Sequence, residues 1–210
     1  GARIAPLIGA NADEVAVCDS TSVNLFKIAA AATRHRGRRH KIVTERGNFP
    51  TDPYMLQGLV GLVPDLELVC AERADIEAAI DSQTFLVVLT HVHYGSAEMF
   101  DLAALTARAH AQGAQVLWDL SHSVGAVPVE LGAARADFAV GCTYKHLNGG
   151  PGAPAFMYVR HDLQADLAPV LSGWLGHARP FEFADDYIPA AGMTRHRCGT
   201  PPILSFAALD

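Results

Sequence analysis

The chain has 210 residues, half of them hydrophobic and only 18% charged, with 16 Lys and Arg against 22 Asp and Glu. This composition is that of a globular protein with a substantial core, and it excludes a disordered chain. The net charge of −6 argues against nucleic acid as a partner. Residues 34–41 form a basic run, which a solvated helix end and loop explains best.

The cysteines and the apolar runs indicate the compartment. Four cysteines lie far apart without a CxxC pair, which favours a reducing compartment over a disulfide framework. No apolar run reaches the length of a membrane span, and the first residues lack the apolar core of a signal peptide. We therefore expect a cytoplasmic enzyme with no membrane association. Position 1 is not Met, and the last residues begin an apolar, helix-like segment, so we expect part of a longer polypeptide.

Strand-like and helix-like patterns alternate along the chain. In order, the spacing predicts a strand at 14–18, a helix at 23–33, a strand at 41–44, a helix at 53–58, a strand at 66–70 and a helix at 74–80. A strand at 84–90, a helix at 101–112, and strands at 115–119, 138–142 and 155–159 follow. The run 84–90 is almost continuously apolar, as in a strand buried on both faces of a parallel sheet. Residues 171–177 and 195–202 are loop-like, and could form a subunit contact, a site rim or plain loop.

These patterns predict a fold class and a ligand-binding edge of the sheet. Alternating strands and helices indicate an α/β domain of three layers, with a mainly parallel sheet flanked by helices. Ligands of such sheets bind beyond the carboxyl ends of the strands. That rule places Ser22, Thr90, Asp119 and Lys145 on one rim. The polar turn 19–22 is explained by helix capping alone, although free amides at the same turn could also bind a phosphate.

Lys145 is the most distinctive of these residues. It follows the strand 138–142 and precedes a loop too rich in Gly and Pro to be helical. Desolvation in such a pocket would lower its pKa and free the amine to attack carbonyl groups, as Schiff-base enzymes require. A lysine in a solvated turn is the plainer reading, and the decision depends on the rest of the chain.

Other site chemistries are weaker. His91, His93, Asp119 and His122 could form a metal-hydrolase site, but an HxH pair among ten histidines is a weak signal. A dinucleotide site lacks its glycine motif after the first strand, because the glycines at 149–152 precede a strand instead. A non-catalytic scaffold or sensor domain explains none of the rim residues.

Pyridoxal phosphate accounts for more of the rim. That cofactor needs a lysine for the Schiff base, an acid beside the pyridinium nitrogen, a phosphate cup and a stacking group. Lys145, Asp119, the turn 19–22 and Phe49 supply these four groups. A buried carboxylate beside the ring nitrogen keeps it protonated, and the ring is then an effective electron sink.

The same residues resemble a known family. Six motifs are similar, in order, to those of the kynureninase family, within the aminotransferase-like group of pyridoxal-phosphate enzymes, and they span nearly all of the chain: TSVNL at 21–25, NFPTD at 48–52, WDLSHSVG at 118–125, DFAVGCTYKHLNGGPG at 137–152, GWLGH at 173–177 and GTPPI at 199–203. His146 stands where many relatives have Tyr.

The resemblance implies a role for each matched residue. Lys145 would form the Schiff base, Asp119 would pair with the ring nitrogen with Asp52 nearby, and Tyr144 would carry protons. The implied cofactor-binding set is Thr21, Ser22, Phe49, Pro50, Thr51, Asp52, Thr90, Asp119, His122, Tyr144, Lys145, Trp174 and Thr200. Among these, Phe49 would stack on the ring, His122 would lie near its 3′-oxygen, and Trp174 and Thr200 would complete the site across a homodimer interface. No metal is implied.

The implied reaction is hydrolysis of L-kynurenine, or its 3-hydroxy form, to L-alanine and an anthranilate, in tryptophan catabolism and NAD biosynthesis. A desulfurase-like lyase or an aminotransferase of the same cofactor class is the alternative, although neither Cys142 nor Cys198 lies in a loop typical of a desulfurase. We expect residues 1–210 to be the large domain, without the family's N-terminal arm and small C-terminal domain. That small domain carries the arginine for the substrate carboxylate. The chain alone is therefore expected to be poorly active or inactive.

Overall fold

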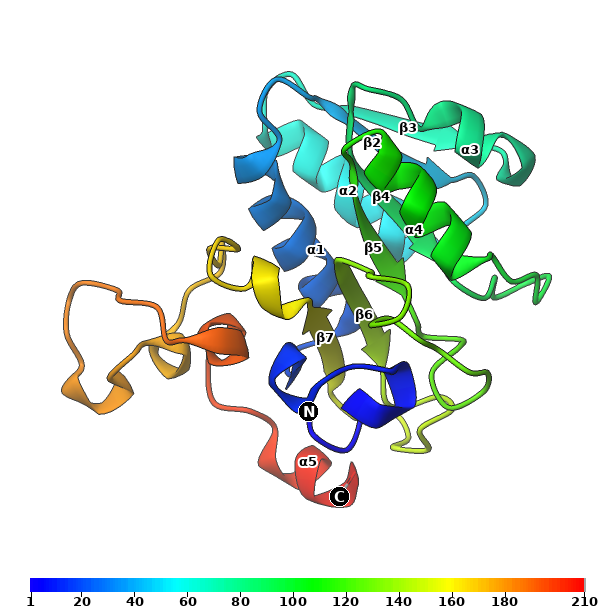
Figure 1. The fold of residues 1–210 in the computed structure, drawn as a ribbon. Helices are drawn as coiled ribbons and strands as arrows, with labels where there is room; N and C mark the ends of the chain where they lie inside the picture. Colours follow the sequence, from blue (N-terminus) through cyan, green and yellow to red (C-terminus); the bar gives the residue numbers. More distant parts are fainter. Residues whose placement is uncertain (210) are drawn as a thin grey trace.

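A seven-stranded sheet forms the centre of the computed structural model, which describes residues 1–209 (Figure 1). The strand order is β1-β7-β6-β5-β4-β2-β3. The neighbours β6, β5, β4, β2 and β3 are parallel, whereas β7 runs antiparallel to both β6 and β1. The bounds are β1 Val15–Val17, β2 Lys41–Glu45, β3 Glu67–Ala71, β4 Thr84–Thr90, β5 Gln115–Asp119, β6 Phe138–Cys142 and β7 Ala155–Val159.

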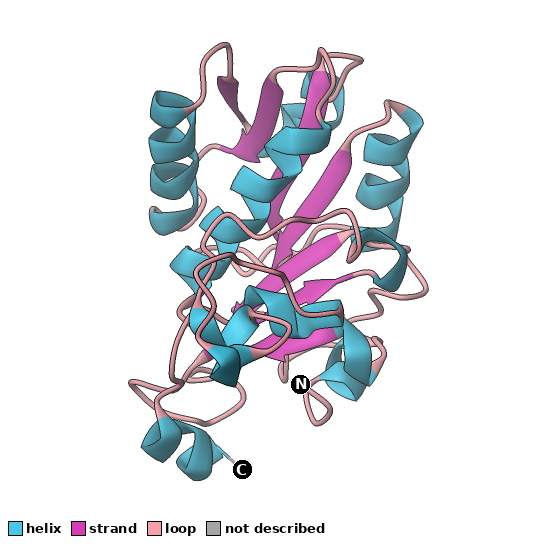
Figure 2. Ribbon diagram, turned by 90° about the vertical axis from the view of Figure 1, so that its left-hand side faces the viewer, coloured by secondary structure: helices cyan, strands magenta, loops and turns pink. Residues whose placement is uncertain are grey.

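Helices cover both faces of this sheet, which gives three layers (Figure 2). Leu25 and Ile28 of α1 and Leu56 of α2 pack on one face, and Leu102 and Leu105 of α4 pack on the other. The helix bounds are α1 Thr21–Ala32, α2 Thr51–Leu62, α3 Ile76–Ala79, α4 Leu102–Ala111 and α5 Ile203–Leu209.

Neighbouring residues of the central strands face opposite layers. In β5, Val116 and Trp118 pack with α4, whereas Leu117 packs with α1 and α2. Every residue of β4 and β6 is buried, because helices lie on both sides of them. The near-continuous apolar run at 84–90 therefore does mark a strand buried on both faces. The three-layer, mainly parallel fold is confirmed.

The strands at 84–90, 115–119, 138–142 and 155–159 have the predicted bounds, but three helices differ from prediction by two residues or more at one end. α1 begins at Thr21 rather than at residue 23, because Ser20 is its N-cap. α2 extends past both predicted ends, since buried Leu59 anchors its second half despite Gly58. The helix predicted at 74–80 is a 3-10 turn at Arg73–Asp75 followed by the single turn of α3.

The sheet topology brings distant parts of the chain to one edge. Thr90 and Asp119 are direct partners at the carboxyl ends of β4 and β5. Cys142, the last residue of β6, pairs with Ala155 at the start of β7. The amide of Ala155 donates to the Asp19 carbonyl, so the connection from β1 to α1 reaches the same edge. The predicted rim is therefore one edge of the sheet.

Residues beyond β7 form loops and short 3-10 turns, and the part that includes residues 171–189 projects from the body (orange in Figure 1). The loop prediction for 171–177 and 195–202 holds, except for single 3-10 turns at Trp174–Gly176 and Gly192–His196. Among the described helices, none has the length and apolarity needed to cross a bilayer.

Candidate active site

The chain has three lysines, and Lys145 differs from the other two. Lys27 is paired with Asp19 at 2.8 Å, and Lys41 is paired with Asp81 at 2.5 Å. The Lys145 amine instead lies 2.9 Å from Nε2 of His122, with no carboxylate in salt-bridge contact among residues 1–209. Of the three amines, it is the one that no ion pair holds in its charged form.

His122 is a neutral partner for this amine. Burial, followed by the charge of Lys145, lowers the pKa of His122 to about 4. Nε2 of the neutral ring therefore accepts a hydrogen bond from Lys145, and the proton resides on Nδ1. Nδ1 is buried and has no hydrogen-bond partner in the described part of the chain. A buried donor without a partner is costly, and it marks a place where a ligand atom would be stabilising.

Aromatic rings surround Lys145. Its amine lies 5.5 Å from the ring centroid of Phe49 and 5.5 Å from that of Tyr144. Both rings are partly exposed, at 40% and 43%. Tyr94, from the loop after β4, packs edge-on against Phe49 and faces the His122 ring. Burial, followed by the neighbouring Cys142, raises the pKa of the Tyr144 hydroxyl. Phe49 and Tyr144 therefore flank the amine, and Tyr94 adjoins this group through Phe49 and His122.

Two buried carboxylates lie beside this group. Asp119 is 3% exposed at the end of β5, and its Oδ1 accepts a hydrogen bond from the Ser121 amide at 2.8 Å. Asp52 is 2% exposed in the first turn of α2, and its Oδ2 lies 3.3 Å from the Thr90 hydroxyl. Since the two strand ends meet and α2 begins at the same edge, both acids are near Lys145.

Burial acts on both acids in the same direction. It is the largest cause of a raised pKa at Asp119 and of a strongly raised pKa at Asp52. The negative charge of Asp119 raises the pKa of Asp52 further, whereas the positive charge of Lys145 lowers the pKa of both. One lysine does not compensate two buried acids. A second cationic group at this place would be held strongly.

The beginning of α1 is on the same edge but makes different contacts. Ser20 caps the helix, since its hydroxyl accepts from the Val23 amide at 3.3 Å. Thr21 and Ser22 are half-buried residues of the first turn, where amides lack partners within the helix. Asp19 takes no part in capping, because it pairs with Lys27.

The remaining predicted residues separate into two groups. Pro50 and Thr51 lie at the start of α2, next to Asp52, and Pro50 is the N-cap residue. Trp174 is 42% exposed and packs on Phe181 in the projecting segment. Thr200 is exposed and lines a cavity of about 390 Å³ with Asp19 and Cys198. In the part of the chain that the structure describes, no hydrogen bond or ring contact joins Trp174 or Thr200 to Lys145.

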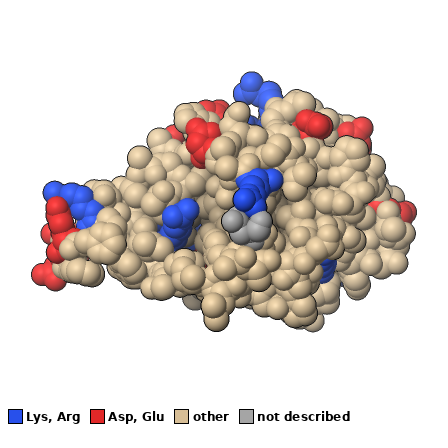
Figure 3. Space-filling model, turned by 90° about the horizontal axis from the view of Figure 1, so that it is seen from below, with Lys and Arg blue, Asp and Glu red and all other residues tan. Residues whose placement is uncertain are grey.

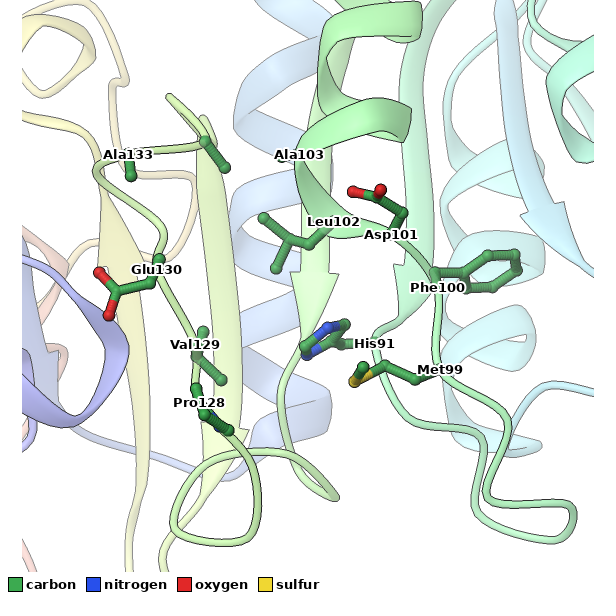
Figure 4. Close-up of a pocket in the computed structure, with 11 residues that line it drawn as sticks. His91, Met99, Phe100, Asp101, Leu102, Ala103, Pro128, Val129, Glu130 and Ala133 are labelled. Carbon is green, nitrogen blue, oxygen red and sulfur yellow. The ribbon is translucent and has the colours of Figure 1, made fainter.

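The histidines of the metal-hydrolase alternative are not brought together. The His91 ring packs on Trp118 and lies between Met99 and Val129 in a cavity of about 520 Å³ (Figure 4). Nε2 of His93 bonds to the Gly47 carbonyl. His122 is engaged with Lys145. Among residues 1–209, no group of three His, Cys, Asp or Glu side chains could hold a metal ion.

Sequence analysis missed Asn48 and Tyr94 as members of the site. Asn48 lies in the quoted motif at 48–52, but its side chain is buried and bonds to three other residues of the cluster. Its position at a polar strand-to-helix connection was the available signal. Tyr94 lies in an exposed loop without periodicity, and no sequence pattern would single it out.

The residues present fit a pyridoxal-phosphate cofactor. An amine that forms no ion pair within residues 1–209 is available for a Schiff base, and two buried acids that share one lysine would hold a cationic ring nitrogen. The orphaned Nδ1 of His122 would gain a partner. The fold and this cluster define the class of protein, an α/β enzyme domain of the pyridoxal-phosphate-dependent, aminotransferase-like type.

Comparison with known families places the chain within that class. The model of the family described as "Aminotransferase class-V" matches residues 2–210, so the chain belongs to the class-V aminotransferase family. The cofactor of these enzymes is pyridoxal 5′-phosphate.

Its relatives include bacterial kynureninases. The chain is 53% identical over 211 residues to kynureninase of Deinococcus radiodurans, covering 100% of this chain and 51% of the relative. It is 49% identical over 216 residues to kynureninase of Burkholderia mallei, covering 100% of this chain and 52% of the relative. The chain thus spans about half the length of the curated relatives it matches.

Solved structures support the fold. A cysteine desulfurase from Thermococcus onnurineus superimposes with a TM-score of 0.82 at 25% identity, over 98% of this chain and 52% of that one. A cysteine desulfurase from Escherichia coli gives 0.84 at 17% identity, over 99% of this chain and 53% of that one. The second likeness concerns the fold alone.

Proposed function

We propose that the protein is a kynureninase, which hydrolyses the Cβ–Cγ bond of L-kynurenine, or of 3-hydroxykynurenine, to L-alanine and anthranilate or 3-hydroxyanthranilate. The observation that carries the proposal is 53% identity over the whole chain to a kynureninase. The cluster around Lys145 supports it, because it contains the amine, acids and aromatic rings that the cofactor requires. One water is consumed for each bond cleaved. The pathway served would be tryptophan catabolism and NAD biosynthesis.

When bound, the cofactor supplies an electron-withdrawing ring that stabilises negative charge on the carbon next to the substrate's amino group. Asp119 and Asp52 favour a protonated ring nitrogen, because each is a buried carboxylate in need of a cation. Phe49 would cover one face of the ring. Thr21 and Ser22, with the free amides of the first turn of α1, would bind the phosphate, whereas the Thr90 hydroxyl donates to Asn48 on the side of the two acids.

Lys145 would anchor the cofactor in the resting protein and, once released by the substrate amine, take the proton from the substrate Cα. His122 orients this amine, since its neutral Nε2 accepts from it. Tyr144 lies on the other side of the amine with a hydroxyl whose raised pKa keeps it protonated, so it would donate a proton during the later steps.

We propose further that the protein is a homodimer whose sites lie at the interface. Trp174 packs on Phe181, and Thr200 lines a separate cavity, so that within residues 1–209 neither shares a hydrogen bond or ring contact with Lys145, which supports a role at the site of a partner. Phe181 and Phe183 beside Trp174 are 77% and 75% exposed, an apolar surface that a second copy would cover. Figure 3 shows that the face of the molecule seen from below carries few charged side chains. The four free thiols support a cytoplasmic location.

Cysteine desulfurization is the second candidate, favoured by the superposition on the Thermococcus onnurineus enzyme. A desulfurase needs a mobile thiol, whereas Cys142 is buried and Cys198 donates to the Leu171 carbonyl. The 25% identity is also well below the 53% found with a kynureninase.

The test is a product assay with the full-length protein and pyridoxal phosphate. With L-kynurenine we expect equimolar anthranilate and alanine, and with L-cysteine no alanine. Alanine from cysteine but not from kynurenine would contradict the proposal in favour of the desulfurase. Asp119→Asn is the matched variant, since it removes the acid without shortening the side chain, and its activity with L-kynurenine should fall.

A further inference from the structure

Asn48 lies at the centre of the polar cluster, in the connection between β2 and α2. It is 4% exposed, and its side chain uses both ends. Oδ1 accepts from the Thr90 hydroxyl at 2.6 Å and from the Phe49 amide at 2.7 Å. Nδ2 donates to Oδ2 of Asp52 at 3.2 Å. One amide thereby joins a strand end, a loop aromatic and a helix acid.

The hydrogen atoms can be assigned from these distances. The Thr90 hydroxyl has one hydrogen and two nearby acceptors, Oδ1 of Asn48 at 2.6 Å and Oδ2 of Asp52 at 3.3 Å. The shorter contact takes the hydrogen, because 2.6 Å is within the usual range for O–H···O bonds and 3.3 Å is beyond it. Asn48 is then the side-chain donor to Asp52, and an amide is needed because a carboxylate cannot donate when ionised.

Each end of this amide controls a group next to Lys145. The bond to its main chain fixes Phe49, whose ring centroid is 5.5 Å from the amine. The bond to Oδ2 favours the ionised form of Asp52, which burial and Asp119 oppose. The Lys145 charge also favours that ionised form. His122 faces Lys145, and His146 and His93 act in turn on His122.

We propose that Asn48 is a positioning residue of this active site, which orients Phe49 and favours the ionised form of Asp52, the second carboxylate beside the cofactor's ring nitrogen. The inference rests on the proposed function. The inference adds a residue to the proposed function, because Asn48 bonds to neither Lys145 nor the reacting atoms. Asn48 acts through two neighbours, Phe49 and Asp52, and measurements can separate these two effects.

The experiment uses the full-length protein loaded with pyridoxal phosphate, and compares Asn48→Asp with Asn48→Ala. Both variants remove the donor to Asp52, and Asn48→Asp also adds a third acid. We expect kcat to fall about tenfold in Asn48→Ala, the usual effect of losing one hydrogen bond to a charged group, with a smaller change in KM. The acidic limb of the pH–kcat profile should shift to higher pH, and further in Asn48→Asp.

The cofactor's visible absorption gives a readout independent of turnover, and its pH dependence should shift in the same order. Asn24→Ala is the matched control, because Asn24 is also a fully buried asparagine but bonds to Cys18. It should lower the unfolding temperature without moving the pH dependence. In an Asp52→Asn background, Asn48→Ala should no longer shift the acidic limb.

Two outcomes overturn the inference. One is a wild-type pH dependence in both Asn48 variants, and the other is a shift in Asn24→Ala as large as in Asn48→Ala. In either case the wild-type protein would still cleave kynurenine, so failure of the inference differs from failure of the proposed function. If the proposed function itself failed, the wild-type protein would not cleave kynurenine.

Discussion

The two ends of the sheet each bury an aspartate at a strand terminus, but they treat its charge differently. At the amino end of β6, Asp137 is 2% exposed and its oxygens are fully used. Oδ1 pairs with Arg160 at 2.9 Å, and Oδ2 receives His110 Nε2 at 2.7 Å and the Val116 amide at 2.8 Å. The chain supplies its own compensation, so this acid stabilises the fold.

At the carboxyl end, Asp119 and Asp52 are equally buried but lack such partners. Among residues 1–209, Lys145 is the positive group that acts on both, and burial raises the pKa of each. Comparison of Asp137 with Asp119 and Asp52 shows that burial of an acid does not by itself identify a functional site. What distinguishes the site is burial that the chain leaves uncompensated, and such groups are characteristic of functional positions.

Lys145→Ala should have the largest effect. We expect kynurenine cleavage by the full-length protein to fall by at least about 10²–10⁴-fold, the contribution of a positioned acid or base. The cofactor's Schiff-base absorption should disappear. Lys41→Ala is the control, because Lys41 is paired with Asp81 away from the cluster and should keep the absorption. Activity that survives in Lys145→Ala would show that the carboxyl edge of the sheet is not the active site.

Asp137→Asn tests the compensated end. Removing the acid leaves Arg160 and His110 beside a neutral amide, so we expect a loss of about 2–3 kcal/mol in the free energy of unfolding. Denaturant unfolding measures it. Activity per folded molecule should not change. A loss of activity at full stability would show that this end also serves function.

Asp119→Asn should raise the free energy of unfolding of the cofactor-free protein, whereas Asp137→Asn lowers it. The raised pKa of Asp119 means that its ionised form is disfavoured by folding, a cost present at neutral pH and relieved as pH falls. A neutral amide removes this cost, so we expect the free energy of unfolding to rise by about 1 kcal/mol while activity falls. Equal destabilisation in Asp119→Asn and Asp137→Asn would erase the difference between the two ends.

A smaller effect involves His196, which lies beside Lys27 behind α1. Burial, followed by Lys27, lowers the pKa of His196 to about 3 from the usual 6.5. The unfolded chain therefore binds the extra proton first, and the stability present above pH 6.5 is lost as pH falls toward 3. His196→Gln should flatten the fall of the unfolding temperature below pH 6.5 without changing the cofactor's absorption. An unchanged slope would contradict it.

Much of the fold was predictable because its strands are apolar runs with clear ends. β4, β5, β6 and β7 have the predicted bounds, and their carboxyl edge follows from the parallel topology. The antiparallel insertion of β7 between β6 and β1 was not predictable, since an apolar run of five residues carries no direction. α2 exceeded its prediction because tertiary packing of Leu59 overrides the low helix propensity of Gly58.

The site was predictable where a residue follows a strand end. Thr90, Asp119, His122 and Lys145 converge for that reason. Asn48 was not predicted, because its importance comes from partners that are 1, 4 and 42 positions away in the sequence. Trp174 and Thr200 rest on family resemblance, and their proposed role depends on a second chain.

The most direct test of the account identifies the residue that bears the cofactor. The full-length protein is loaded with pyridoxal phosphate, reduced with borohydride, digested and analysed by mass spectrometry. We expect the added mass on the peptide that contains Lys145, because Lys27 and Lys41 are held in ion pairs. Added mass on either of those lysines, or on no lysine, would contradict it.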